Sequence, residues 1–137
     1  MRLQIQSLEV QSPNDFEGAF QAAAKWGARA LTVNPDPVMT ANRNQILDFA
    51  AKNRLPGIYP WSVYVEDGGL MSYATKLSDL YRRAATYVDK ILKGAKPGEL
   101  PVEQPTRFEF MINLKTAKQI GVTIRHSVLY RADKVIR

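Results

Sequence analysis

The chain has 137 residues, of which 45% are hydrophobic and 23% are charged, a composition typical of one globular domain with a hydrophobic core. It contains no cysteine, which excludes disulfides, thiolate nucleophiles and cysteine-ligated metals, and its single histidine, His126, excludes a multi-histidine metal site. The formal net charge of +6 at pH 7 permits binding to anionic surfaces, but without a motif it indicates only a basic surface. Nucleic acid is therefore not predicted as a partner.

No apolar run approaches the ~20 residues that a membrane-spanning helix needs, so membrane insertion is not predicted. The N-terminal segment alternates apolar and polar residues and lacks the continuous apolar core of a signal peptide. We therefore expect that the chain either stays in the cytoplasm or lacks its true beginning.

The first half of the chain alternates between predicted strands and helices. Residues 3–10 are predicted to form a strand, followed by a helix that Ser12 caps, Pro13 begins and Gly27 ends. Short apolar strands are predicted within "RALTVNP" and "LPGIYP", and a helix is predicted between them, over residues 40–53. This alternation predicts an α/β fold with a mostly parallel sheet flanked by helices, built from βαβ units.

The second half is predicted to contain a short turn or helical piece over 63–65, a strand over 70–73 and then the longest helix. The apolar face of that helix consists of Tyr81, Ala84, Ala85, Val88 and Leu92. Residues 94–105 are rich in proline and are predicted to be an extended linker before a C-terminal strand–helix segment. In that segment "TRFEFMINL" is predicted to be a strand, Asn113 caps a short helix that Gly121 closes, and a turn and a final short helix follow.

Three predicted loops lie at the carboxyl ends of strands, where open parallel sheets bind their ligands. They span residues 34–40, 59–69 and 72–76. Their aromatic and polar side chains suit a small-molecule pocket: Asn34, Asp36, Tyr59, Trp61, Glu66, Ser72 and Tyr73.

Most of these side chains have more than one interpretation. Asp36 lies between two prolines, where it could accept a hydrogen bond from a ligand or form a turn. Tyr59 and Trp61 could stack on a ligand or cover the edge of the sheet. A general acid–base pair made of Glu66 and Asp67 is disfavoured, because adjacent residues tend to point in different directions. No catalytic residue is predicted.

Gly68 and Gly69 follow the two carboxylates in "EDGGLMSYA". They do not form a phosphate-binding loop, because no G-x-x-x-x-G-K or G-x-G-x-x-G pattern surrounds them. A positive φ, or the close approach of another chain segment, explains them better. The stretch is therefore predicted to be a close-approach loop and strand beside a ligand cleft.

Nearly the whole chain resembles the ABC-transporter substrate-binding proteins of the tryptophan/tyrosine-binding-like family. The resemblance is densest in "GGLMSY", "YRRAATYVDKILKGAKP" and "LPVEQPTRFEFMINLKTAK". It implies the type I periplasmic-binding-protein fold, in which two α/β lobes joined by crossover strands hold the ligand between them. Residues 1–137 resemble part of the C-terminal lobe, from its second strand onward, so the chain is expected to be a single, partial lobe.

The resemblance implies a non-enzymatic function without cofactor or metal. The chain would be the solute-binding component of an ABC importer, which closes around a small organic solute such as an amino acid by a hinge motion and presents it to an ABC permease. The ligand-binding candidates on this lobe are Asp36, Tyr59, Glu66 and Ser72. Trp61 lies in a stretch that departs from the family, so the solute itself does not transfer. The implied location is the periplasm or cell envelope, or the cytoplasm if Met1 is the true start.

A lobe without its partner exposes apolar surface and a sheet edge. We therefore expect a homo-oligomer, in which the segment after Gly94 could be exchanged between copies. The alternative function is a truncated, stand-alone oligomeric α/β domain that acts as a scaffold or binds nothing. Concentration-dependent association without ligand binding would favour this alternative.

Overall fold

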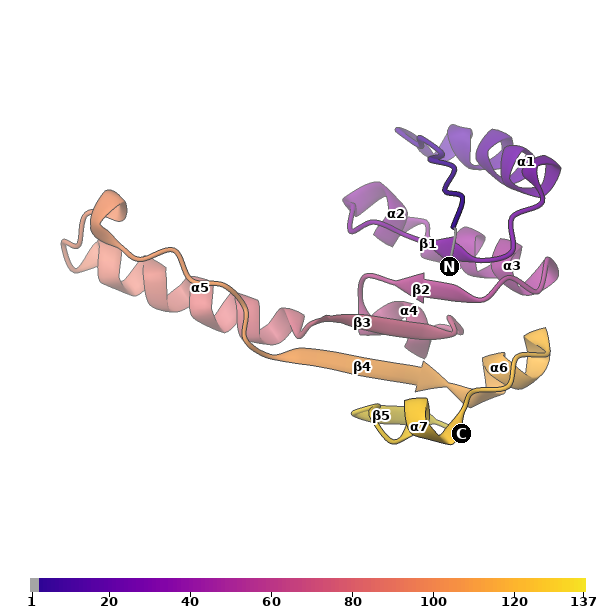
Figure 1. The fold of residues 1–137 in the computed structure, drawn as a ribbon. Coiled ribbons are helices and arrows are strands. Elements are labelled where there is room, and N and C mark those ends of the chain that lie inside the picture. Colours follow the sequence, from indigo (N-terminus) through magenta and orange to yellow (C-terminus); the bar gives the residue numbers. More distant parts are fainter. Residues whose placement is uncertain (1–2) are drawn as a thin grey trace.

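The computed structural model describes residues 3–137, and these residues contain one five-stranded sheet (Figure 1). The strands follow one another across the sheet in chain order: β1 Leu31–Thr32, β2 Gly57–Tyr59, β3 Met71–Thr75, β4 Phe108–Asn113 and β5 Lys134–Ile136. β1, β2 and β3 are parallel, β3 and β4 are antiparallel, and β4 and β5 are parallel. The prediction of an α/β fold with a mostly parallel sheet is confirmed.

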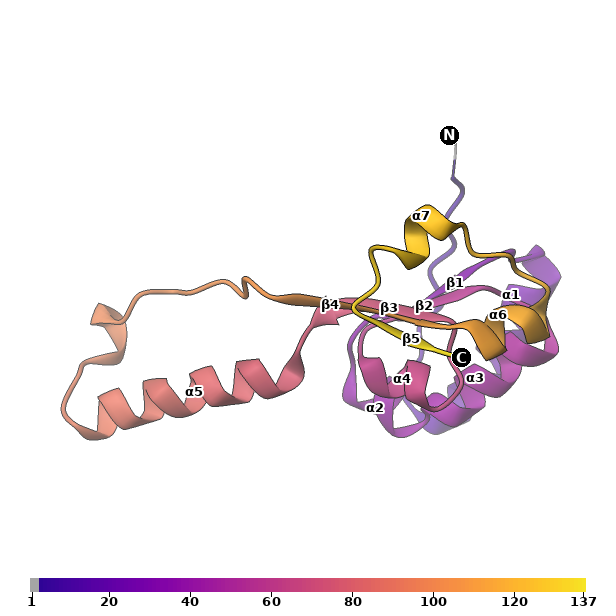
Figure 2. The ribbon, with the colours of Figure 1, turned by 90° about the horizontal axis from the view of Figure 1, so that it is seen from below.

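Helices cover the sheet unequally. The helices of the first half are α1 Phe16–Trp26, α2 Pro37–Ala41, α3 Arg43–Lys52 and α4 Ser62–Glu66. Those of the second half are α5 Leu77–Leu92, α6 Leu114–Ile120 and α7 His126–Leu129. Figure 2 shows α2, α3 and α4 on one face of the sheet and α7 on the opposite face. The main core lies under the helical face, where it contains Phe16, Ile46, Leu47, Tyr59 and Tyr64.

Local capping signals place the helix ends where the sequence predicts them. A short 3₁₀ turn, Pro13–Asp15, leads into α1, and the Asp15 carboxylate accepts the backbone N–H of Ser12 at 2.7 Å. The N–H groups of Ser12 and Gln11 hold the pKa of Asp15 below its ordinary value, because they stabilise the charged carboxylate. Gly27 ends α1 with φ +76°, a left-handed conformation that favours glycine.

Three predicted elements differ from the structure. Residues 3–10 form no strand, because no neighbouring strand pairs with them within the described residues, and Ile5 is 86% exposed. The helix predicted over 40–53 is two helices that break at Asn42, since Pro37 begins a separate turn upstream. The predicted final short helix is present as α7, but the tail then ends in β5, because residues 134–136 find a parallel partner in β4.

The segment between β3 and β4 projects from the sheet as an arm, defined here as residues 77–107 (Figures 1 and 2). α5 forms its outgoing half, and an extended segment returns beside the helix. The Tyr87 hydroxyl donates to the Pro101 carbonyl at 2.5 Å, and Arg83 pairs with Glu103. The linker predicted over 94–105 is extended apart from one 3₁₀ turn, Pro97–Glu99.

Candidate ligand-binding site

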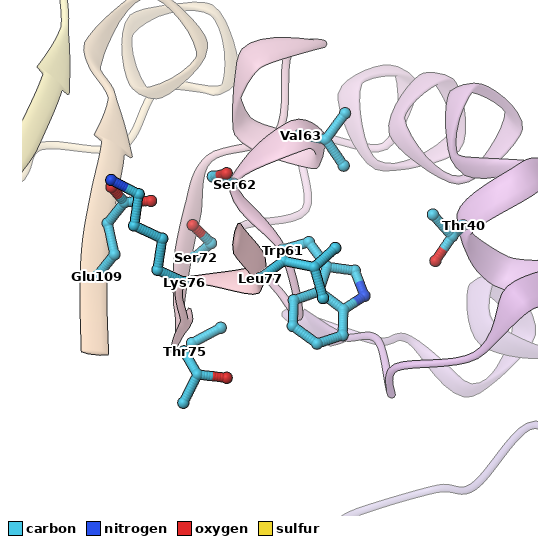
Figure 3. Close-up of a pocket in the computed structure, with 10 residues that line it drawn as sticks. Thr40, Trp61, Ser62, Val63, Ser72, Thr75, Lys76, Leu77 and Glu109 are labelled. Carbon is cyan, nitrogen blue, oxygen red and sulfur yellow. The ribbon is translucent and has the colours of Figure 1, made fainter. Parts of the chain in front are cut away.

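A cavity of about 160 Å³ opens at the carboxyl ends of β2 and β3, on the helical face of the sheet. Its lining comes from α2, α4, β3, the start of α5 and β4: Thr40, Trp61, Ser62, Val63, Ser72, Ala74, Thr75, Lys76, Leu77 and Glu109. Figure 3 shows Ser62 and Ser72 in the middle of this wall, with Lys76 and Glu109 at one end and Trp61 and Thr40 at the other. The cavity therefore combines one aromatic wall, several hydroxyls and one charge of each sign.

The pleat of the sheet decides which side chains reach the cavity. Successive residues of a strand point to opposite faces, so Ser72 and Ala74 share the helical face and Tyr73 points away. Glu109 joins them, because it is opposite Ala74 in the antiparallel pair of β3 and β4. Ser72, a predicted ligand-binding candidate, is 2% exposed and lines the cavity.

The Asp36 carboxylate is engaged as a helix cap. It accepts the backbone N–H groups of Val38 at 2.7 Å and Met39 at 3.3 Å, at the N-terminus of α2. The Asp36 carbonyl also accepts the Thr40 hydroxyl at 2.9 Å. Of the two interpretations left open for Asp36, the turn-forming one describes its contacts in this structure, and its effect on the cavity is to hold Thr40 in place.

Tyr59 lies in the core and does not line the cavity. It is 3% exposed, and its ring stacks on that of Tyr64 with centroids 5.2 Å apart. Trp61 is half-buried, packs against the same cluster and also lines the cavity. Tyr59 and Tyr64, called the tyrosine floor below, thus belong to the buried cluster against which Trp61 packs.

The two carboxylates of "EDGG" turn to different partners. Glu66 pairs with Lys134 of β5 at 3.2 Å, and Asp67 pairs with Arg43 of α3 at 2.6 Å. Neither lines the cavity. The expectation that they diverge is confirmed, and the geometry gives no acid–base pair.

The two glycines of "EDGG" have the properties predicted for them. Gly68 has φ +113°, a conformation that L side chains rarely adopt. At Gly69 an added Cβ would lie 2.8 Å from the Tyr59 ring and 2.8 Å from the Tyr64 carbonyl oxygen. Gly69 is therefore a close-approach position, and it lets the tyrosine floor pack against the start of β3.

The comparison with protein families decides the identity of the fold. A family profile described as ABC transporter substrate binding protein matches residues 1–136. The chain belongs to this family. Substrate-binding proteins of this family are not enzymes.

Solved structures support the family assignment. One solved structure is described as an ABC domain in complex with L-Trp from Streptococcus pneumonia; it is 28% identical to this chain and has a TM-score of 0.88. The match covers 98% of this chain and 46% of that structure's chain. A conserved domain protein from Vibrio cholerae is 27% identical, with a TM-score of 0.85, and 92% of this chain covers 42% of it. A ligand-free, open substrate binding protein with adhesive properties from Clostridium difficile shares the fold at 20% identity and a TM-score of 0.59. That match covers 88% of this chain and 41% of the other.

The chain spans less than half the length of the solved structures it matches. A comparison with curated proteins gave no significant match. Within residues 3–137 no helix is both long and apolar enough to cross a bilayer, and no group of three carboxylate or histidine side chains is placed to hold a metal ion.

Sequence reasoning missed several residues of the cavity wall. Thr40, Ser62, Lys76 and Glu109 line it but were not among the four candidates. Ser62 and Lys76 each lie just beyond the end of a parallel strand, so their position carried a usable signal. Glu109 lines the cavity only because β4 pairs with β3 in the antiparallel direction. The local sequence around Glu109 does not predict this pairing.

The buried tyrosine floor predicts a loss of stability at alkaline pH. Burial, with a smaller contribution from neighbouring Tyr64, raises the pKa of Tyr59 to about 12 from its ordinary value of 10.0. The neutral form is favoured in the folded state, so its contribution is complete below pH 10 and is lost as pH rises towards 12. We expect the wild-type free energy of unfolding to fall by about 2–3 kcal/mol more than that of Tyr59→Phe over this range.

Urea denaturation at a series of alkaline pH values measures this difference. Tyr130→Phe is the matched control, because Tyr130 is 94% exposed and should leave the alkaline loss unchanged. Parallel pH curves for wild type and Tyr59→Phe would contradict the prediction.

Proposed function

We propose that this chain is one half of the solute-binding component of an ABC importer and that its cavity is half of the site for a small organic solute such as an amino acid. The observation that carries the proposal is the cavity at the carboxyl ends of β2 and β3, open on one side, in a chain that covers less than half of its solved relatives. The relative described in complex with L-Trp supports an aromatic amino acid as the first class to test.

The chemistry of the cavity wall suits an amino acid. Trp61 offers an aromatic face for stacking, and the hydroxyls of Ser62 and Ser72 can donate to a carboxylate or accept from an ammonium group. Lys76 and Glu109 supply one positive and one negative charge at the same end of the wall, which matches a zwitterion. In this proposal Asp36 and Tyr59 act by holding Thr40 and Trp61, and Glu66 reaches a ligand only if it leaves Lys134.

A second lobe would close over the open side of this cavity by a hinge motion, and the closed form would be presented to an ABC permease. The whole protein would work in the periplasm or cell envelope, where importers of this type collect their solutes. These features concern the whole two-lobed protein, of which this chain supplies less than half by length.

A thermal-shift screen of the purified chain with L-Trp, L-Tyr and small aromatic acids tests the proposal. We expect a ligand-dependent rise in Tm that Trp61→Ala abolishes and Trp26→Ala preserves. Trp26 is a matched control, because it lies at the end of α1, is 46% exposed and does not line the cavity. A rise that Trp61→Ala leaves intact, or no rise with any solute, would contradict binding at this cavity.

The alternative function, a stand-alone oligomeric α/β domain with a scaffold role or no binding role, is favoured by one observation. Every residue of α5 is at least partly exposed, and Tyr81 on its apolar face is 69% exposed. Such a face is a self-association surface if nothing else covers it.

A further inference from the structure

The longest helix, α5, begins at the ligand cavity. Thr75, Lys76 and Leu77 line the cavity, and α5 runs from there away from the sheet (Figures 1 and 2). The N-terminal end of α5 therefore faces the cavity, and a helix of 16 residues carries a partial positive charge at that end. Such an end attracts anions, because its first N–H groups have no partner within the helix.

No side chain caps this end of α5 in the part of the chain that the structure describes. The N-cap residue is Lys76, whose ammonium group cannot accept a hydrogen bond. Among the same residues, nothing accepts the N–H groups of Leu77 and Ser78. Asp79 is the acidic residue of the first turn, but it pairs with Arg82 at 2.8 Å and does not line the cavity. Two backbone donors are thus available beside the Lys76 ammonium group.

The buried hydroxyl of Ser72 is a second, independent sign of a ligand at this place. Ser72 is 2% exposed, and its hydroxyl makes no hydrogen bond to another described residue. Among the described residues, no side-chain oxygen that is sealed from solvent lacks a hydrogen bond, so the Ser72 oxygen opens into the cavity that it lines. Buried hydroxyls are nearly always paired, and this one is placed to pair with a ligand atom.

We propose that the solute is an α-amino acid whose carboxylate binds at the N-terminal end of α5. The carboxylate accepts hydrogen bonds from the first N–H groups of α5 and from the Ser72 hydroxyl, and the Lys76 ammonium group supplies the opposite charge. This inference rests on the proposed function, to which it adds a required chemical group of the solute and the place where that group binds.

Glu109 sets the orientation of the solute. It is opposite Ala74 in the β3–β4 pair, and it lies at the same end of the cavity wall as Lys76 (Figure 3). An α-amino acid carries its ammonium group on the carbon next to its carboxylate, so that group pairs with Glu109. The side chain of the solute then points along the wall to Trp61. An acid without an ammonium group leaves Glu109 close to a second anion and binds more weakly.

Three indole compounds test the required group. L-Trp has both charges, tryptamine lacks the carboxylate, and indolepropionate lacks the ammonium group. NMR titration of the nitrogen-labelled chain detects binding even when the Kd is about millimolar. We expect L-Trp to shift the amide signals of Leu77 and Ser78. Tryptamine should bind at least about tenfold more weakly and leave these two signals in place, because it offers them no acceptor.

Two substitutions of Lys76 separate its charge from the helix end. Lys76→Gln and Lys76→Asn both remove the charge, but asparagine is a strong N-cap and glutamine is not. Lys76 has the extended backbone of an N-cap, so the asparagine oxygen can accept the N–H group that the carboxylate needs. We expect Lys76→Asn to have the higher Tm without ligand and to bind L-Trp at least about fivefold more weakly. A purely structural role would not move stability and binding in opposite directions.

The same pair of substitutions at Arg125 is the matched control. Arg125 is the N-cap residue of α7 and makes no side-chain cap, and α7 lies on the opposite face of the sheet from α2 and α4, which line the cavity (Figure 2). Arg125→Asn and Arg125→Gln should bind L-Trp equally. Ser72→Ala should weaken binding by about fivefold or more, because the carboxylate loses one donor.

Two outcomes would overturn this inference and leave the proposed function standing. One is tryptamine binding as tightly as L-Trp, and the other is equal affinity of Lys76→Asn and Lys76→Gln for L-Trp. Shifts of the Leu77 and Ser78 signals with inorganic phosphate but not with L-Trp would overturn the assignment to amino acids. If none of the three indole compounds bound, the proposed function would fail together with this inference.

Discussion

Replacing Gly69 with alanine is expected to lower the free energy of unfolding by about 3 kcal/mol. The added Cβ would lie 2.8 Å from two carbons of the Tyr59 ring and 2.8 Å from the Tyr64 carbonyl oxygen. That carbonyl also accepts the Gly69 N–H at 2.6 Å, so it cannot move away without loss of this hydrogen bond. Tyr59 is buried and stacked on Tyr64, which leaves its ring little room to yield.

Urea denaturation of Gly69→Ala and Gly18→Ala separates this steric effect from the general effect of the substitution. Gly18 lies within α1 with nothing within 4 Å of its added Cβ, so alanine there should stabilise the protein by up to about 1 kcal/mol. If both variants were as stable as the wild type, the close approach at Gly69 would not constrain the fold.

The parts of the fold that the sequence predicted well are those with local causes. Ser12, Gly27, Asn113 and Gly121 mark helix ends through hydrogen bonds and backbone conformations that involve only their near neighbours. Residues 3–10 have the alternation of a strand, but no strand pairs with them within the part of the chain that the structure describes, and pairing is a non-local property. The same reasoning explains β5, whose three residues become a strand only because β4 lies beside them.

The candidate site shows a similar division. Residue type and strand position led to Ser72, which lines the cavity. The same criteria led to Asp36 and Glu66, whose carboxylates already hold an N-cap and an ion pair with Lys134. A sequence shows that a carboxylate lies near a strand end. It does not show which N–H group forms a hydrogen bond with that carboxylate, or which cation forms an ion pair with it.

The arm shows how an amphipathic pattern can mislead. The predicted apolar face of α5 exists, but it is directed to solvent, where apolar side chains contribute no burial energy. The pattern therefore indicates a partner that the sheet does not supply. The cavity is likewise open on one side, so the described residues complete neither feature.

Replacing Asn113 with alanine is expected to lower the free energy of unfolding by about 3 kcal/mol, because two buried backbone groups would lose their partners. Asn113 is 5% exposed; its side chain donates to the Val65 carbonyl at 3.1 Å and accepts the Thr116 N–H at 3.2 Å. It thus caps α6 and ties the end of β4 to α4, the helix that carries Ser62 into the cavity wall.

Asn53→Ala is the matched control, measured by the same urea denaturation. Asn53 donates to the Phe49 carbonyl at 2.9 Å, but that hydrogen bond is exposed, so water can replace it and the loss should stay within about 0.5 kcal/mol. Asn113→Asp separates the two roles of Asn113, since aspartate can still cap Thr116 but, when ionised, cannot donate to Val65. Equal losses for Asn113→Ala and Asn53→Ala would mean that α4 is held in place by its apolar contacts alone. A large loss for both Asn113 variants would mean that the buried bond to Val65 fixes α4, and with it the wall of the cavity.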